Sequence, residues 1–325
     1  MTILSHCHTT YLVAIFKNRP SFSPSMKTIH TLQAGEKLNK RQFLEYFEKK
    51  VRKTIRTNKL IEKEERILVA CSGGKDSTTA LYLINKLTKD NKKITVEAIH
   101  IDPSIGKYSE INKKNIIKFC KENNIKLNII SFREEFGYSV CYIKNLLSQK
   151  GIKYTSCTIC GILRRYILNK KAKGLKTTKL VTGHNLDDEA QNIIMNLFQN
   201  HVEILPRLGP TTGLNKNKGF IPRIKPLYFC TEQETLLYSK LKNFPIKYEK
   251  CPCRTDAYRK DVANMLDIFE KDHKATKTGI IQSFLKLSPI LKKQTKGKAK
   301  ICKKCKEPSS GDICNTCKII DLLRK

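Results

Sequence analysis

The stretch Ser72-Gly73-Gly74-Lys75-Asp76-Ser77 decides the fold of this chain. An apolar run over residues 67–71 precedes it and a segment with helical periodicity over 79–84 follows it, which predicts a strand, a tight glycine turn and a helix N-terminus. Adjacent glycines let the backbone approach an anion, and the first N–H groups of a helix are unpaired and carry the positive end of its dipole. With a lysine charge and two serine hydroxyls, the stretch predicts a phosphate-binding loop.

The glycine spacing separates this loop from the Walker type, because no glycine precedes Gly73 at the Gly-x4-Gly-Lys-Ser/Thr spacing. It resembles instead the Ser-Gly-Gly-x-Asp-Ser pyrophosphate loop of enzymes that cleave ATP between the α and β phosphates and adenylate a substrate. The alternative is an ordinary glycine turn, which the strand and helix periods on either side disfavour.

The chain is strongly basic. Its 325 residues include 63 Lys and Arg against 29 Asp and Glu, a formal net charge of +34. This excess indicates a polyanion partner, with nucleic acid the first candidate. The alternative is a set of solvated lysine-rich faces without such a partner.

Thirteen cysteines are present, several of them in Cys-x2-Cys pairs, and no secretory segment is evident. This pattern favours metal ligation in a reducing cytoplasm over disulfides. The longest early apolar run, residues 11–16, is too short to span a bilayer. We therefore expect a cytoplasmic protein without a membrane segment.

Four regions follow from the periodicity. Residues 1–36 show no sustained period and receive no fold assignment, and residues 37–60 read as a basic amphipathic helix that either packs on the core or contacts RNA. Within 61–290, strands at 94–102, 127–132 and 179–184 alternate with helices such as 110–123, which predicts an α/β fold with a doubly wound parallel sheet. Residues 205–220 read as a long surface loop, and 291–325 form a separate small module.

Ligands of such sheets bind beyond the carboxyl ends of the strands, where Ser72, Asp102 and Gly183 all fall. The segment 183–189 leaves one strand and starts a helix with the acidic pair Asp187 and Asp188. Paired carboxylates beside a nucleotide could hold Mg²⁺ or orient a reacting group, whereas acids in a first helical turn are also ordinary dipole partners. Its position at the expected edge favours an active-site role.

Two sets of cysteines have metal-binding spacing. Cys157 and Cys160 could grip a metal or cluster, or form a redox pair, and a third thiolate from the 251–253 segment would leave one iron of a four-iron cluster without a protein ligand and able to bind sulfide. The second set is a Cys-x2-Cys, x8, Cys-x2-Cys array typical of a structural zinc knuckle, with thiol redox chemistry as the alternative. Its members are Cys302, Cys305, Cys314 and Cys317.

Together these motifs resemble the tRNA-uridine 2-thiolation enzymes of the TtuA/NcsA type, within the N-type ATP pyrophosphatases of the PP-loop superfamily. The resemblance covers most of the chain, from about residue 42 to the terminal knuckle. It is carried by the loop 72–77, Cys157 and Cys160 with Gly161, the segments 183–189 and 223–227, Cys251-Pro252 and the last four cysteines.

In such enzymes ATP lies on the loop, a tRNA uridine is adenylated at its C2 oxygen, and sulfur then displaces AMP. The resemblance implies a catalytic acid at Asp188, supported by Asp187 and Arg164, and a [4Fe-4S] cluster on Cys157, Cys160 and Cys251 whose fourth iron carries the sulfur. It also implies a homodimer that takes sulfur from a ubiquitin-like carrier protein or from free sulfide. The implied contacts of ATP, with Mg²⁺, are Ala70, Ser72, Gly73, Gly74, Lys75, Asp76, Ser77, Ile101, Arg164 and Gly183.

The chain departs from the family pattern in three places. The N-terminal zinc finger of the family has no counterpart, since only Cys7 and nearby histidines are present before residue 30 and Met26 could be an alternative start. Arg164 stands where many relatives have lysine, and Cys253 stands where relatives tend to have an aromatic residue, so Cys253 or, more remotely, Cys230 could replace Cys251 as the third cluster ligand. Two other functions stay open, an amidoligase or lysidine-forming enzyme with the same loop and a non-catalytic zinc and RNA-binding protein.

Overall fold

The computed structural model describes residues 27–32, 34–212, 219–249, 251–253, 257–294 and 300–324, in two units that meet between Phe43 and Leu44. The first unit contains a short antiparallel hairpin of β1 (His30–Thr31) and β2 (Lys37–Leu38). Strand structure therefore occurs within the segment 1–36, for which the sequence predicts no fold. The predictions for residues 1–26, no zinc site and an alternative start at Met26, lie outside the described residues.

A six-stranded sheet in the order β5-β4-β3-β6-β8-β7 forms the centre of the second unit, and every neighbouring pair runs parallel except β7 with β8. The predicted α/β fold with a doubly wound parallel sheet is confirmed, with one antiparallel strand, β7, at its edge. Its strands are β3 (Glu65–Ala70), β4 (Ile94–Asp102), β5 (Lys126–Ser131), β6 (Lys179–Val181), β7 (Thr211–Thr212) and β8 (Arg223–Ile224).

Two predicted boundaries need correction. The strand predicted over 179–184 ends at Val181, because the chain leaves the sheet there to enter the site. The segment predicted as a long loop, 205–220, contains the end of the 3-10 helix η1 (Val202–Arg207) and strand β7, which pairs with β8.

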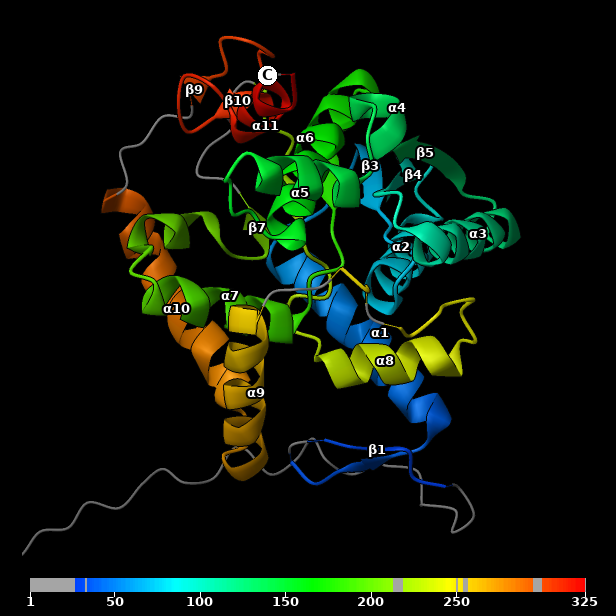
Figure 1. Ribbon diagram of the computed structural model, residues 1–325. Coiled ribbons are helices and arrows are strands. Elements are labelled where there is room, and N and C mark those ends of the chain that lie inside the picture. Colours follow the sequence, from blue (N-terminus) through cyan, green and yellow to red (C-terminus); the bar gives the residue numbers. More distant parts are fainter. Residues whose placement is uncertain are drawn as a thin grey trace, which may run out of the picture. The chain divides into compact units, whose positions relative to one another are not determined.

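Some helices pack against this sheet and others against neighbouring helices (Figure 1). None of them, in the part of the chain that the structure describes, combines the length and apolar composition that a membrane-spanning helix requires. Their bounds are α1 (Lys40–Thr57), α2 (Lys75–Thr88), α3 (Gly106–Glu122), α4 (Phe132–Phe136), α5 (Val140–Gln149), α6 (Ser156–Gly174), α7 (Leu186–Phe198), α8 (Glu232–Leu241), α9 (Ala257–Asp272), α10 (Thr276–Gln294) and α11 (Asn315–Arg324).

Alternation along the strands supplies two apolar faces. Leu68, Ile99 and Leu180 belong to the cluster that packs on α5 and α6, while Ile67 and Val69 point the other way and are also buried. Helices α2 and α3 contact the strands β3, β4 and β5. A separate apolar cluster joins α7, α9 and α10.

The basic helix α1 buries its apolar side. Phe47 is fully buried and stacks on Tyr238 of α8 with ring centroids 4.5 Å apart, and Val51 is buried one turn later. Lys50 Nζ lies 2.8 Å from the Glu234 carboxylate, so part of the basic face also holds α8. The core-packing interpretation of this helix is therefore confirmed for these residues.

The order of the strands creates a switch point between β3 and β6. From β3 the chain continues to β4 on one side, whereas β6 pairs with β3 on the other side. At such a point the connections leave in opposite directions and open a crevice at the carboxyl ends of both strands. The loop 72–77 follows β3 and Gly183 follows β6, so the two predicted site segments meet there.

Candidate active site and cysteine centres

The phosphate-binding loop is closed by its own hydrogen bonds. The Ser72 N–H donates to Ser77 Oγ at 3.1 Å, the two serine hydroxyls lie 3.1 Å apart, and the Gly74 N–H donates to Ser72 Oγ at 3.3 Å. Gly73 has φ +83°, and a Cβ on it would lie 2.9 Å from the backbone oxygen of Asn112. The turn therefore needs glycine for both its conformation and its packing.

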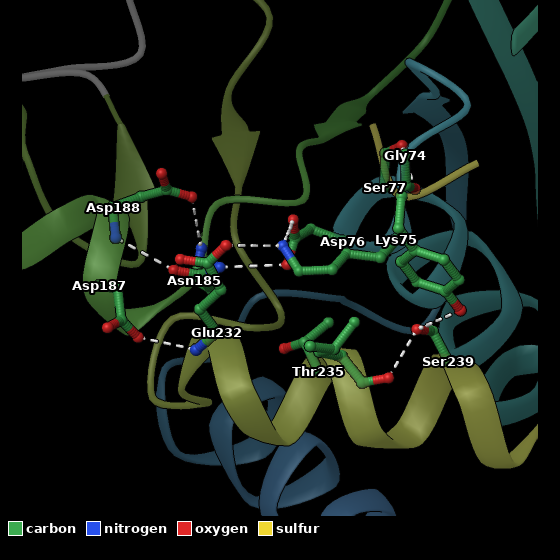
Figure 2. A network of polar contacts seen from close by, with 12 residues as sticks. Gly74, Lys75, Asp76, Ser77, Asn185, Asp187, Asp188, Glu232, Thr235 and Ser239 are labelled. Atoms are coloured by element: carbon green, nitrogen blue, oxygen red, sulfur yellow. Dashed lines mark hydrogen bonds and ion pairs between the residues drawn. The ribbon is translucent and has the colours of Figure 1, made fainter. Parts of the chain in front are cut away.

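Charged side chains converge at the start of α2 (Figure 2). Lys75 Nζ lies 2.8 Å from Asp76 Oδ2 and 3.0 Å from Glu232 Oε1, and Asn185 Nδ2 donates to Asp76 Oδ1 at 3.1 Å. Burial raises the pKa of the Asp76 carboxyl, Lys75 opposes this, and the charge of Asp188 raises it further. Carboxylate oxygens are ligands that Mg²⁺ prefers, and the lysine ammonium suits the phosphate oxygens of a nucleotide.

The acidic pair of α7 divides into two roles. The Asp187 Oδ1 atom accepts from Lys277 Nζ at 2.5 Å, and its Oδ2 accepts from the Glu232 N–H at 2.7 Å, so both oxygens are engaged in a buried contact. Asp188 forms a capping box with Asn185, in which its N–H donates to Asn185 Oδ1 at 3.0 Å and its Oδ2 accepts from the Asn185 N–H at 3.3 Å. Burial raises the pKa of the Asp188 carboxyl.

Gly183 brings the two halves of this site into contact. A Cβ at this position would lie 2.6 Å from the Ser77 backbone nitrogen and 2.7 Å from the Asp76 carbonyl carbon. The backbone after β6 therefore rests directly on the first turn of α2. Only the absence of a side chain permits this approach.

The cysteine pair of α6 meets the 251–253 segment. Cys157 Sγ lies 3.9 Å from the Cys253 carbonyl oxygen, and Cys160 and Cys251 pack against the same apolar cluster. Burial raises the pKa of the Cys160 thiol, Arg164 lowers it, and the nearby Cys251 and Cys157 raise it. The three thiols predicted as cluster ligands thus gather in one partly buried group, and this purely sulfur donor set fits an iron–sulfur cluster.

A fourth thiol joins this group without any motif to predict it. Cys141, in the first turn of α5, has its Sγ 3.3 Å from Cys253 Sγ. It belongs to no Cys-x2-Cys pair, so the sequence carries no signal for it. Cys230 lies elsewhere, fully buried and close to Lys50 and Glu234.

Arg164 lies near both the cysteine pair of α6 and strand β4. It follows Cys160 by one helical turn, and its charge acts on both Cys160 and His100 of β4. His100 is 2 % exposed, and its Nδ1 donates to the Cys71 carbonyl oxygen at 2.8 Å, directly before the loop. Ala70 and Ile101 stand at the carboxyl ends of β3 and β4 beside it.

The terminal cysteines form a second centre between the hairpin β9 (Lys300–Ile301) with β10 (Pro308–Ser309) and α11. The four Sγ atoms of Cys302, Cys305, Cys314 and Cys317 all lie within 4.8 Å of one another, with Cys302 to Cys317 at 3.8 Å and Cys305 to Cys314 at 3.6 Å. A tetrahedron with Zn–S bonds of about 2.3 Å has edges of about 3.8 Å. The donor set and its spacing therefore fit one tetrahedral ion.

Comparison with known proteins identifies the family. A PP-loop domain model matches residues 43–253. The chain is 37% identical over 284 residues, 87% of each protein, to the tRNA-5-methyluridine(54) 2-sulfurtransferase of Pyrococcus horikoshii, and 27% identical to the tRNA 2-thiolation protein NcsA of Haloferax volcanii over 90% of this chain and 95% of that protein.

A solved structure has the same fold. The U34-tRNA thiolase NcsA from Methanococcus maripaludis, determined with its [4Fe-4S] cluster, superposes with a TM-score of 0.76 at 28% identity and covers 91% of this chain and 93% of its own. The fold of this chain therefore agrees with that of the solved thiolase. The chain therefore belongs to the PP-loop family, within the group of tRNA 2-thiolation proteins of the TtuA/NcsA type.

Proposed function

We propose that this protein is an ATP-dependent tRNA-uridine 2-sulfurtransferase. Two groups of neighbouring residues support the proposal: the loop 72–77 with the helix start at Asn185 and Asp188, and the thiols of α6 with Arg164, whose charge also acts on His100 beside the loop. A phosphate loop alone supports any ATP-cleaving enzyme. A thiol group beside it supports one that delivers sulfur.

The loop would bind ATP through its N–H groups, with Lys75 exchanging its carboxylate partners for phosphate oxygens. The C2 oxygen of a tRNA uridine then bonds to the α-phosphorus while the bond to pyrophosphate breaks. Arg164 would stabilise the developing negative charge, and the Asp76 and Glu232 carboxylates would hold Mg²⁺. Asp188 is the better candidate for the catalytic acid, because Asp187 already has both oxygens engaged.

In the second half, sulfur bonds to C2 and the C2–O bond to AMP breaks. Cys157, Cys160 and Cys251 would hold a [4Fe-4S] cluster, which supplies an iron without a protein ligand as a site for sulfide. The partly buried, apolar surroundings of these thiols limit the access of water to the activated uridine. Cys302, Cys305, Cys314 and Cys317 would hold zinc in a structural role.

The substrate and partners remain part of the proposal. The formal charge of +34 suits tRNA as the substrate. Two relatives of this chain are named for tRNA uridines at different positions, 34 and 54. We also predict that the sulfur donor is a ubiquitin-like carrier protein or free sulfide. A homodimeric assembly and a cytoplasmic location are further predictions.

An anaerobic assay with the metal-loaded protein, unthiolated tRNA, ATP and sulfide tests the function. We expect 2-thiouridine in the digested tRNA by mass spectrometry and one pyrophosphate released for each thiolated base, with the thiolation lost in Cys157→Ala. Mapping the thiolated nucleoside distinguishes position 34 from position 54. Pyrophosphate release with an amine acceptor and without sulfide would instead select an amidoligase, and no pyrophosphate release with tRNA would select a binding protein.

A further inference from the structure

A pocket of about 210 Å³ lies on the side of α6 that faces the terminal cysteine module. Its wall on the helix is formed by Ile162, Arg165, Tyr166 and Asn169, which are spaced three and four residues apart and so share one helical face. The module contributes residues of β10 and the start of α11. Because the same helix carries Cys157 and Cys160 in its first turn, the pocket lies close to the proposed sulfur site.

Two guanidinium groups give this pocket its charge. Arg165 and Arg223 both line it, and within the described residues neither has a carboxylate at ion-pair distance. Arg223 Nε is buried without a hydrogen-bond partner. Burial, with a smaller contribution from Arg165, lowers the pKa of the Arg223 guanidinium to about 10.

The acidic residue in the pocket does not compensate these charges. The Glu307 carboxylate lies 2.9 Å from Lys173 Nζ and also accepts from the Asn169 amide, so its charge is already balanced. Two like charges without a carboxylate at ion-pair distance favour a bound anion. The planar fork of arginine matches the oxygens of a phosphate group in particular.

Aromatic and polar groups complete the pocket. Phe220 is 42% exposed and its ring centroid lies 6.0 Å from Arg223 Cζ, while Tyr166 lines the wall formed by the helix. Ser310 offers a hydroxyl, and Asn315 begins α11 with the positive end of its dipole. An exposed ring next to two arginines is the combination that binds a base together with its phosphate.

We propose that this pocket binds one nucleotide of the RNA substrate, with a phosphodiester on Arg165 and Arg223 and the base against Phe220. The inference rests on the proposed function. ATP phosphates have their own loop at the end of β3, and the large positive charge of the chain favours a polyanion over a free mononucleotide. The pocket thus positions a nucleotide of the tRNA close to the uridine that reacts.

Steady-state thiolation by the metal-loaded enzyme tests this, with tRNA and ATP varied in turn. We expect Arg165→Ala and Arg223→Ala each to raise the KM for tRNA about tenfold and to lower the slope of log KM against log salt by about one, because each loses a phosphate contact. The KM for ATP should not change. Arg165→Lys and Arg223→Lys should restore part of the affinity for tRNA, because lysine keeps the positive charge but lacks the paired N–H donors of the planar guanidinium group.

Arg66→Ala is the matched control, since Arg66 is exposed at the amino end of β3, away from the site, and should leave both constants unchanged. Ser310→Glu adds a negative charge at an exposed position of the pocket and should raise the KM for tRNA even if an arginine variant fails to fold. An unchanged KM for tRNA in the folded double alanine variant and in Ser310→Glu would overturn the proposal. A raised KM for ATP would overturn it in favour of a mononucleotide site, whereas unsubstituted enzyme without any thiolation would count against the proposed function itself.

Discussion

The Sγ atoms of Cys141 and Cys253 lie 3.3 Å apart, so Cys253 directs its thiol toward α5. We therefore infer that Cys251, rather than Cys253, acts with Cys157 and Cys160. We predict that Cys251→Ala loses the iron and the cluster absorbance of anaerobically prepared protein, whereas Cys253→Ala retains most of both. Iron analysis and visible spectroscopy measure the outcome. Loss in Cys253→Ala with retention in Cys251→Ala would reverse the assignment.

Substitutions in the acidic pair of α7 should have different effects, with Asp188 acting on catalysis and Asp187 on stability. Asp188→Asn should lower kcat for thiolation at least about a hundredfold, the scale of a lost general acid or base, and leave the dissociation constant of ATP unchanged. Stopped-time thiolation assays and nucleotide titrations measure the two effects. An unaltered kcat would remove Asp188 from the mechanism.

Asp187→Asn should act mainly on folding. It replaces one of the two carboxylate partners of the buried Lys277 ammonium by a neutral amide while Asp267 remains, which should lower the free energy of unfolding by about 2 kcal/mol. Urea denaturation measures this loss. If Asp187→Asn is as stable as the unsubstituted protein but loses activity, Asp187 belongs in the catalytic group.

A methyl group at Gly183 should disrupt the phosphate loop. Gly183→Ala places Cβ against the Ser77 nitrogen, and the overpacking should lower the free energy of unfolding by about 1–3 kcal/mol and weaken ATP binding. Gly174→Ala is the control, because a Cβ there meets nothing within 4 Å. Equal stability and ATP affinity in both variants would show that the backbone contact is unimportant.

Stability should fall in acid because of His100. Burial lowers the pKa of its imidazole in the folded protein, while the unfolded chain takes up the proton near pH 6.5. The contribution of His100 to the free energy of unfolding is therefore complete above about pH 6.5. It is lost as the pH falls below this value, and the free energy of unfolding then decreases by up to about 1.4 kcal/mol per pH unit. Urea midpoints against pH should show this slope in the native protein and a weaker one in His100→Asn.

Metal removal should loosen the C-terminal helix. α11 buries Ile319 against the cluster that also holds α5 and α6, while the module around the four cysteines has few other apolar contacts. Cys305→Ser should release the zinc and destabilise the protein by about 2 kcal/mol through the exposed side chains. Metal analysis and thermal unfolding measure both effects. Unchanged unfolding after metal loss would contradict a structural role.

The sequence could predict the features that depend on local spacing. The loop 72–77, the strand 94–102 and the cysteine pairs are readable because their turn chemistry or ligand spacing is contained in a short segment. The residues that contact them in the folded protein could not be predicted from the sequence. Cys141 meets Cys253, and Lys277 meets Asp187, only through the tertiary fold, across separations that carry no pattern in a single sequence.

Gly183 has a mechanical consequence. Since the strand exit after β6 touches the backbone of Ser77 and Asp76, a shift of the loop on binding a nucleotide must displace the start of α7 as well. Asn185 strengthens this linkage through its hydrogen bonds to Asp76 and Asp188. A displacement of the loop 72–77 would thus reach Asp188 through direct contacts between neighbouring residues.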